Sequence, residues 1–497
     1  MVFASAAAAL TVRSTSRHGA GLSPDSSGYF RLANDVAANG LAFLAEDKSV
    51  TQPPLYPMLL ALAKGATGAS LAQVAAWSNA LSAALVVALL LESARRCGVR
   101  PIGLAITGAI ACGFAPFTAV WAMAWSEPAF LCCVAGCLLA LQASGQSFRL
   151  VVTAGVLAAA ASMVRYAGLV LMPVGFVWLL VAGGEDLRRR ALRALCFVAI
   201  PALVLCSYFF RNAWVSGAML GPRPRSSSGV LANFARMFEA LGGWFVPLGA
   251  PVLASTAAFA VVLAVAISWR DRVVAMSAPA RGGMLMHVAF SVVYAGFIVF
   301  TSSTVAYDPI DDRLMAPLAP SALIVLAVVL GAGPWRSRAV AAGVAALAAT
   351  FAIGSMASSF SVVEANAQRG AGGFNLDQWH DSPLFARLRS EPRLLQGVVF
   401  SNVPDALHLL LGLEVRMAPA RTRYNSADGA GVDASNLFVV HPELDEAMLV
   451  WREPNMREYL FTPGQLQSMC AVQELAQCAD GSIYRVTRLR DDPRAPR

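Results

Sequence analysis

The sequence predicts a polytopic α-helical membrane protein with a small C-terminal α/β extracytoplasmic domain. Apolar residues make up 57% of the 497 residues and charged residues only 14%, whereas a soluble domain carries about a quarter charged residues. Mean hydropathy is +0.59. Apolar runs recur along the chain, each near the ~20 residues that cross a bilayer, and they shorten after residue 357.

About ten to eleven transmembrane helices are expected from these runs. The runs lie near residues 71–93, 101–120, 126–143, 148–163, 166–183, 190–211, 246–268, 283–304, 314–332 and 336–357. The opening run from Met1 to Val12 is apolar but too short to span, and it lacks the basic start of a signal peptide. We therefore expect a truncated or mis-started first transmembrane helix there.

Arginines in the short connections orient the predicted bundle. The connections 92–100, 183–193, 269–281 and 335–338 are rich in arginine, so the positive-inside rule places them in the cytoplasm. Alternation of the spans then puts the tail from about residue 358 on the extracytoplasmic face. The other segments expected on that face are residues 13–57, 121–127, 211–244 and 306–313 and the neighbourhood of Arg165.

Two domains are expected. Residues 1–357 form the transmembrane bundle with its first extracytoplasmic loop at 13–57, and residues 358–497 form the α/β domain. In the tail, strands are predicted at 397–401, 436–440, 447–451 and 482–487, with a helix over 402–412. About 140 residues are enough for such a domain to have its own core.

Charge and cysteine usage exclude some site classes. The net charge of +8 does not indicate nucleic acid, because only Lys48 and Lys64 are lysines and no dense basic run occurs. Cys470 and Cys478 fall in the tail, where an oxidising compartment would allow a disulfide. No cysteine or histidine spacing predicts a metal site.

The first polar loop contains the leading catalytic candidate. Asp25 follows the first apolar segment closely, and a carboxylate at the outer surface can act as a general base during group transfer. Alternatively, Asp25 caps the helix predicted over 29–44, because Ser-Pro-Asp-Ser is also a good capping sequence. Glu46 and Asp47, later in the loop, are better explained as part of a solvated loop.

Two polar positions further along are expected on the same face. Glu127 lies between Ser126 and Pro128, so it either begins a helix capped by Ser126 or holds a basic residue in place. Arg165 lies between two long apolar runs. It can snorkel to the membrane interface, or its planar guanidinium can bind phosphate or carboxylate oxygens.

The loop over 211–244 begins with three arginines: Arg211, Arg223 and Arg225. They form either a flexible basic connector or an anion clamp over a phosphate group, and long loops in compact domains favour the second interpretation.

The segment 307–313 ends in Asp311, Asp312 and Arg313. These three residues either form a local ion pair, worth little at a surface, or point into a cavity between the bundle and the tail.

In their order along the chain, these positions resemble the GT-C superfamily of membrane glycosyltransferases, close to glycosyltransferase family 39 and the polyprenyl-phosphate-sugar transferases. The resemblance covers nearly the whole chain. Its motifs are the first-loop acid Asp25, the proline-rich re-entry at 53–57, Ser-Glu-Pro at 126–128, Arg-Tyr-x-Gly-Leu at 165–169, Arg-Asn at 211–212 with Gly-x-Arg at 221–223, Asp-Arg at 312–313, and Ser-Asn-x-Pro-Asp at 401–405.

The resemblance implies an inverting transfer of a sugar from a polyprenyl-phosphate-linked donor to a lipid, glycan or protein acceptor. It implies a multi-pass protein of the bacterial inner membrane that acts on the extracytoplasmic face. Asp25 would be the general base, and the donor phosphate would be bound by Arg165, Arg211, Arg223 and Arg225. Supporting or substrate-binding positions would be Tyr29, Tyr56, Glu127, Tyr166, Asp312 and Arg313.

One departure from the family pattern concerns metals. The family's first loop often has paired acids, whereas Asp25 is followed by Ser26. The partner acid is therefore unassigned, and the dependence on a divalent metal is open.

Other function classes predict different sequence features. A transporter or flippase of lipid-linked saccharides would show an internal repeat, charges inside spans and broken helices at the midplane. No repeat is evident here, and the charges gather at the outer rim. A structural or assembly protein would not need the outer acids and arginines. A polysaccharide ligase or polymerase is the nearest enzymatic alternative.

Overall fold

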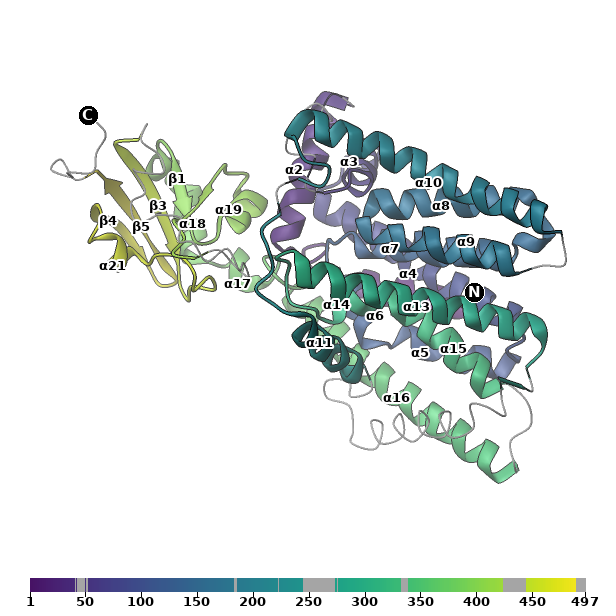
Figure 1. Cartoon of the computed structure of the whole chain (residues 1–497). Coiled ribbons are helices and arrows are strands. Elements are labelled where there is room, and N and C mark those ends of the chain that lie inside the picture. The colour runs from purple at the N-terminus through teal and green to yellow at the C-terminus, as the bar shows by residue number, and fades with distance from the viewer. Residues whose placement is uncertain are drawn as a thin grey trace.

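A helical bundle and a small sheet domain make up the protein, shown as a computed structural model in Figure 1. The structure describes residues 1–40, 42, 50, 52–182, 186–221, 223–244, 273–274, 276–331, 338–422 and 444–488. The sheet domain lies at the end of the bundle where α2 is found (Figure 1), and its helix α19 contacts α2.

Helices of differing length form the bundle. They are α1 (Val2–Ser14), α2 (Pro24–Asn39), α3 (Leu55–Thr67), α4 (Leu71–Arg96), α5 (Pro101–Cys112), α6 (Ala115–Ala122), α7 (Glu127–Gln142), α8 (Phe148–Val164), η4 (Tyr166–Val170), α9 (Leu171–Val181), α10 (Leu187–Ser216), α11 (Val230–Gly243), α13 (Ala278–Thr304), α14 (Asp312–Met315), α15 (Ala319–Gly331) and α16 (Arg338–Arg369).

The predicted membrane class is confirmed. Among the described residues, five helices are long and apolar enough to span a bilayer, or six if α5 and α6, which meet at 49°, form one bent span. Shorter apolar helices occupy further predicted spans, namely α7, α8 and the run over 166–181, and the short helix α1 covers the opening apolar run. The predicted span at 246–268 lies outside the described residues.

Small side chains allow the central helices to pack closely. Ala75, Ala83 and Ala94 of α4 are fully buried, as are Ala154 and Ala158 of α8. Helices in lipid associate through van der Waals contact between closely approaching backbones, which small residues permit. This packing holds the helix ends, and the polar segments at those ends, in fixed relative positions.

A backbone junction anchors the start of α2. Gly21 N–H donates to the carbonyl of Ala122 at 2.8 Å, and Phe374 N–H donates to the carbonyl of Leu22 at 2.8 Å. Gly373 makes this approach possible, since it has a φ of +57° and a Cβ there would lie 1.8 Å from the Leu22 oxygen. Three distant segments therefore fix the position of the first polar loop.

The C-terminal domain is built on a five-stranded sheet with strand order β2-β1-β3-β5-β4. Strand β1 (Val399–Ser401) is parallel to β2 (Arg416–Met417) and β3 (Glu446–Arg452), whereas β5 (Gly481–Thr487) is antiparallel to β3 and β4 (Ala471–Cys478). The helices of this region are α17 (Asp377–His380), α18 (Pro383–Ser390), α19 (Pro404–Leu411) and α21 (Pro463–Leu466).

Most of the strands predicted for the tail are confirmed. Strands β1, β3 and β5 and helix α19 lie where the sequence predicts them, and the predicted strand at 436–440 lies outside the described residues. The sequence does not predict β4, an edge strand without a clean alternation of buried and exposed residues. Helix α16 continues through residue 358 to Arg369, and the division into two domains at that residue stays a prediction.

The sequence left open a disulfide between Cys470 and Cys478, and the structure does not form one. Cys470 and Cys478 are both free thiols, and Cys470 Sγ donates to the carbonyl of Leu466 at 3.3 Å. Cys470 directly precedes β4, and Cys478 is the last residue of that strand. A strand rises about 3.3 Å per residue, so their separation far exceeds the Cα distance of about 6 Å that a disulfide allows.

Candidate functional site

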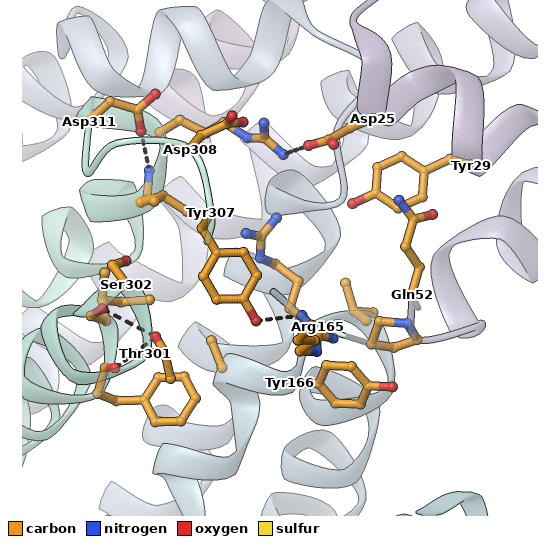
Figure 2. Close-up of a pocket in the computed structure, with 18 residues that line it drawn as sticks. Asp25, Tyr29, Gln52, Arg165, Tyr166, Thr301, Ser302, Tyr307, Asp308 and Asp311 are labelled. Carbon is orange, nitrogen blue, oxygen red and sulfur yellow. Dashed lines mark hydrogen bonds and ion pairs between the residues drawn. The ribbon is translucent and has the colours of Figure 1, made fainter. Parts of the chain in front are cut away.

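A polar cavity of about 350 Å³ opens near the start of α2 (Figure 2). Its walls come from segments that are far apart in sequence: α2, the residues before α3, the turn after α8, the loop after α10, and α13 with the segment that follows it. The lining residues with polar side chains are Asp25, Tyr29, Gln52, Arg165, Tyr166, Arg223, Thr301, Ser302, Tyr307, Asp308, Asp311 and Arg313.

Four charged side chains of alternating sign form a chain beside this cavity. Arg313 Nη2 donates to Asp25 Oδ2, and Arg313 Nε donates to Glu127 Oε1 at 2.5 Å. Arg165 Nη1 reaches the same oxygen of Glu127 at 2.6 Å. The Glu127 side chain is only 1% exposed, and burial of a carboxylate is tolerated when it is paired. Asp25 lies at the open end of the chain, with 37% of its side chain exposed.

The segment before α7 supports both arginines. The Trp125 ring lies 4.3 Å from Arg313 Cζ, in the range of a cation–π contact. Ser126 Oγ accepts from Arg165 Nη1 at 3.1 Å and lies 2.9 Å from the Tyr29 hydroxyl. Burial and the charge of Asp25 raise the pKa of Tyr29 to about 12, so this hydroxyl stays protonated at physiological pH.

The capping interpretations explain less than the ion pairs do. Ser23 is the N-cap of α2, and its N–H donates to Ser26 Oγ at 3.0 Å, while the Asp25 carboxylate pairs with Arg313. Ser126 makes no capping hydrogen bond to α7. Asp25 and Glu127 therefore form ion pairs with arginines and do not cap the helices.

A second wall of the cavity holds Arg223. Its Nη1 donates to the Tyr307 hydroxyl at 2.5 Å. Its Cζ lies 5.5 Å from the centre of the Tyr307 ring and 5.6 Å from the centre of the Tyr166 ring. Two arginines, Arg165 and Arg223, thus line one cavity together with Asp25.

Comparison with known proteins places the fold. No protein-family model matches the sequence, and no curated protein matches it significantly. Among solved structures, ArnT from Cupriavidus metallidurans in the apo state matches over 97% of this chain and 97% of its own, with a TM-score of 0.62 and 15% identity. The chain has the GT-C fold. ArnT bound to undecaprenyl phosphate matches over the same shares with a TM-score of 0.60 and 15% identity.

Two further solved structures share the GT-C fold. The archaeal oligosaccharyltransferase AglB from Archaeoglobus fulgidus, in complex with an inhibitory peptide and a dolichol-phosphate, matches 99% of this chain and 74% of its own, with a TM-score of 0.52 and 12% identity. The arabinofuranosyltransferase AftD from Mycobacteria matches 99% of this chain and 40% of its own, with a TM-score of 0.55 and 14% identity.

Five of the predicted site residues do not line the cavity: Glu127, which pairs with Arg165 and Arg313, and four others. Tyr56 is buried against the edge of the Tyr29 ring, with centroids 5.0 Å apart. Asp312 accepts from Trp244 Nε1 at 3.2 Å. Arg211 donates to Asn212 Oδ1 at 3.0 Å, and Arg225 forms a backbone bridge with Val305. Their roles in a GT-C site stay predictions.

Five polar residues that line the cavity are absent from the predicted site: Gln52, Thr301, Ser302, Tyr307 and Asp308. Partial enclosure raises the pKa of Asp308, and the nearby charge of Asp25 adds to this effect. Asp311 also lines the cavity and accepts from Leu314 N–H at 3.0 Å as the N-cap of α14. The sequence feature that could have indicated Asp308 is its position in a polar stretch between two apolar runs.

The described residues do not fit a divalent metal ion. An Archaeoglobus fulgidus oligosaccharyltransferase was solved in complex with zinc and sulfate, and it matches 90% of this chain and 68% of its own with a TM-score of 0.51 and 13% identity. In the described part of this chain, no group of three or more His, Cys, Asp and Glu side chains could hold a metal. Asp25 and Glu127 are both engaged by Arg313.

Proposed function

We propose that this GT-C protein transfers a sugar from a polyprenyl-phosphate-linked donor to a lipid, glycan or protein acceptor on the extracytoplasmic face, with inversion at the anomeric carbon. The supporting observation is that one cavity joins a carboxylate, Asp25, to two arginines, Arg165 and Arg223. ArnT was solved with undecaprenyl phosphate and AglB with a dolichol-phosphate, and both ligands are polyprenyl phosphates.

In this reaction Asp25 acts as the general base. Its Oδ2 is engaged by Arg313, so Oδ1 takes the proton from the acceptor hydroxyl or amine. The acceptor atom forms a bond to the anomeric carbon as the bond from that carbon to the phosphate oxygen breaks. The electron pair of the broken bond stays on the phosphate, which leaves as the polyprenyl phosphate with one additional negative charge.

The arginines stabilise that developing charge. Arg165 is held by Glu127 and Ser126, and Arg223 is held by Tyr307, so both cations are oriented before the substrate arrives. Preorganised donors of this kind act on the transition state without a cost of reorganisation.

The polyprenyl chain would lie against α13. Phe297 and Ile298 of this helix line the cavity, and Phe300, one turn further on, is 65% exposed. An apolar surface that continues from a charged cavity suits a lipid with a phosphate head group. The hydrocarbon chain would contact the apolar side chains, and the phosphate would contact the charged ones.

The test is Asp25→Asn in membranes supplied with radiolabelled polyprenyl-phosphate sugars, with Asp381→Asn, at an exposed position of the same extracytoplasmic region, as the control. Loss of the general base is expected to lower transfer by about 100-fold or more, whereas the control keeps parental transfer. Undiminished transfer by Asp25→Asn would exclude Asp25 as the base. Absence of transfer by the parent protein with every donor would favour the transporter or flippase alternative.

A further inference from the structure

The guanidinium of Arg313 lies between the two carboxylates of the site. Its Nη2 is bonded to Asp25 and its Nε to Glu127, and the Trp125 ring covers one side of it. Only 13% of the Arg313 side chain is exposed. The two acids come from α2 and α7, and the described hydrogen bonds join both of them to this one side chain.

We propose that Arg313 is the resident cation of this site and joins Asp25 to Glu127 in place of a divalent metal ion. Arg313 is then a positioning residue, which holds the proposed base through a fixed fork of donors. The positioning role rests on the proposed function, in which Asp25 is the base. The identity of the cation rests only on the contacts of Arg313 with Asp25 and Glu127.

Charge balance supports this assignment. Arg313 and Arg165 together carry two positive charges against the two negative charges of Asp25 and Glu127, so the cluster is already neutral. A divalent ion would have to displace Arg313, whose poorly solvated charge would then lose both partners, and removal of one partner from such a pair is strongly unfavourable.

The number of oxygen atoms available to coordinate a metal ion also argues against a divalent ion. Glu127 Oε2 is buried and has no hydrogen-bond partner among the described residues, and Arg313 engages only Oδ2 of Asp25. The two remaining oxygens of these acids are far fewer than the six to eight oxygens that Ca²⁺ takes or the near-octahedral set that Mg²⁺ demands. A guanidinium, in contrast, is planar and permanently charged, and its donors point in fixed directions.

The first experiment measures metal binding with Mn²⁺ alone as the probe. Detergent-purified full-length protein is titrated with Mn²⁺, and free Mn²⁺ is followed by electron paramagnetic resonance. The parent and Asp25→Asn are expected to give the same titration. Arg313→Ala is expected to gain a Mn²⁺ site, and the double variant Arg313→Ala/Asp25→Asn is expected to lose it. Mn²⁺ binding by the parent that Asp25→Asn removes would overturn the proposal, as would the failure of folded Arg313→Ala to gain a site.

The second experiment measures sugar transfer. Parental transfer is expected to be unchanged by EDTA, and Arg313→Ala is expected to lower transfer by about 100-fold. Arg313→Lys keeps the charge but not the fork of donors, so it is expected to recover part of that loss. Inhibition by EDTA that Mn²⁺ reverses would overturn the proposal, and so would parental transfer by Arg313→Ala.

Two controls keep the outcomes separable. If Arg313→Ala does not elute from size exclusion as the parent does, Arg313→Gln, which keeps more of the side-chain volume, replaces it in both experiments. If the parent transfers no sugar from any donor, the proposed function fails, while the Mn²⁺ titration still decides the identity of the cation.

Discussion

Glu127 and Arg165 form an ion pair of 2.6 Å between the start of α7 and the turn that follows α8. The same Glu127 oxygen also accepts from Arg313 Nε at 2.5 Å. One buried acid therefore sets the positions of two arginines, of which one is proposed to bind phosphate and the other holds the proposed base.

Glu127→Gln is expected to destabilise the protein by about 3 kcal/mol, because it leaves two poorly exposed arginines with a single anion. The measurement is the thermal unfolding midpoint in detergent. The matched control is Glu446→Gln, whose pair with Arg485 has side chains 45% and 55% exposed. That change is expected to cost less than about 1 kcal/mol. Equal shifts in the two variants would contradict the anchoring role of Glu127.

Arg223→Gln is expected to lower sugar transfer by about 10- to 100-fold, because Arg223 lines the cavity and is aimed by Tyr307. Arg225→Gln makes the same chemical change two residues away, at a position that does not line the cavity. It should therefore have the smaller effect. Initial rates at several donor concentrations distinguish the two variants, and a greater loss at Arg225 would show that the phosphate is bound elsewhere.

The junction between the bundle and the tail is expected to be less stable at mildly acidic pH. The rings of His18 and His380 are stacked with centroids 3.9 Å apart, and burial together with the charge of His18 lowers the pKa of His380. The unfolded chain then binds more protons than the folded protein below the ordinary histidine pKa of about 6.5, so stability falls as the pH falls through this window.

The measurement for this junction is the unfolding midpoint at pH 7.5 and pH 5.5 for the parent and His380→Gln. The variant should show the smaller decrease between the two pH values, because it lacks the group whose pKa differs between the folded and unfolded states. A decrease as large as that of the parent would assign the pH dependence to other groups.

Gly373→Ala is expected to destabilise the protein by about 1–3 kcal/mol or more, because a β-carbon there collides with the Leu22 carbonyl and the backbone has a positive φ. Sugar transfer should also fall, since this contact anchors the segment before Asp25. The control is Gly464→Ala, where an added β-carbon meets nothing within 4 Å. Its unfolding midpoint should match that of the parent.

Local sequence was enough to place several site residues on one face. Asp25, Glu127 and Arg165 each lie in a short polar break between apolar runs, and alternation of the spans assigns all three breaks to the same side. The structure brings these residues to one cluster. The motif order that resembles the GT-C superfamily also comes from local sequence, and the fold comparison confirms that fold.

The sequence did not predict which charged residues form ion pairs with one another. Arg313 and Asp25 are 288 positions apart, and nothing local indicates that Arg313 pairs with Asp25 and Glu127. Its neighbour Asp311 caps α14. The sequence also left a disulfide between Cys470 and Cys478 open, because closeness in sequence does not reveal that an extended strand separates them.

The sequence by itself determined the membrane class, the approximate spans and the polar segments that share one face, because hydropathy and charge alternation are properties of short stretches. Only the tertiary structure decided that Arg313 joins Asp25 to Glu127, because that contact depends on how α2, α7 and α14 meet at the end of the bundle. The packing of small residues along the helices fixes this meeting point, and no stretch of sequence encodes it alone.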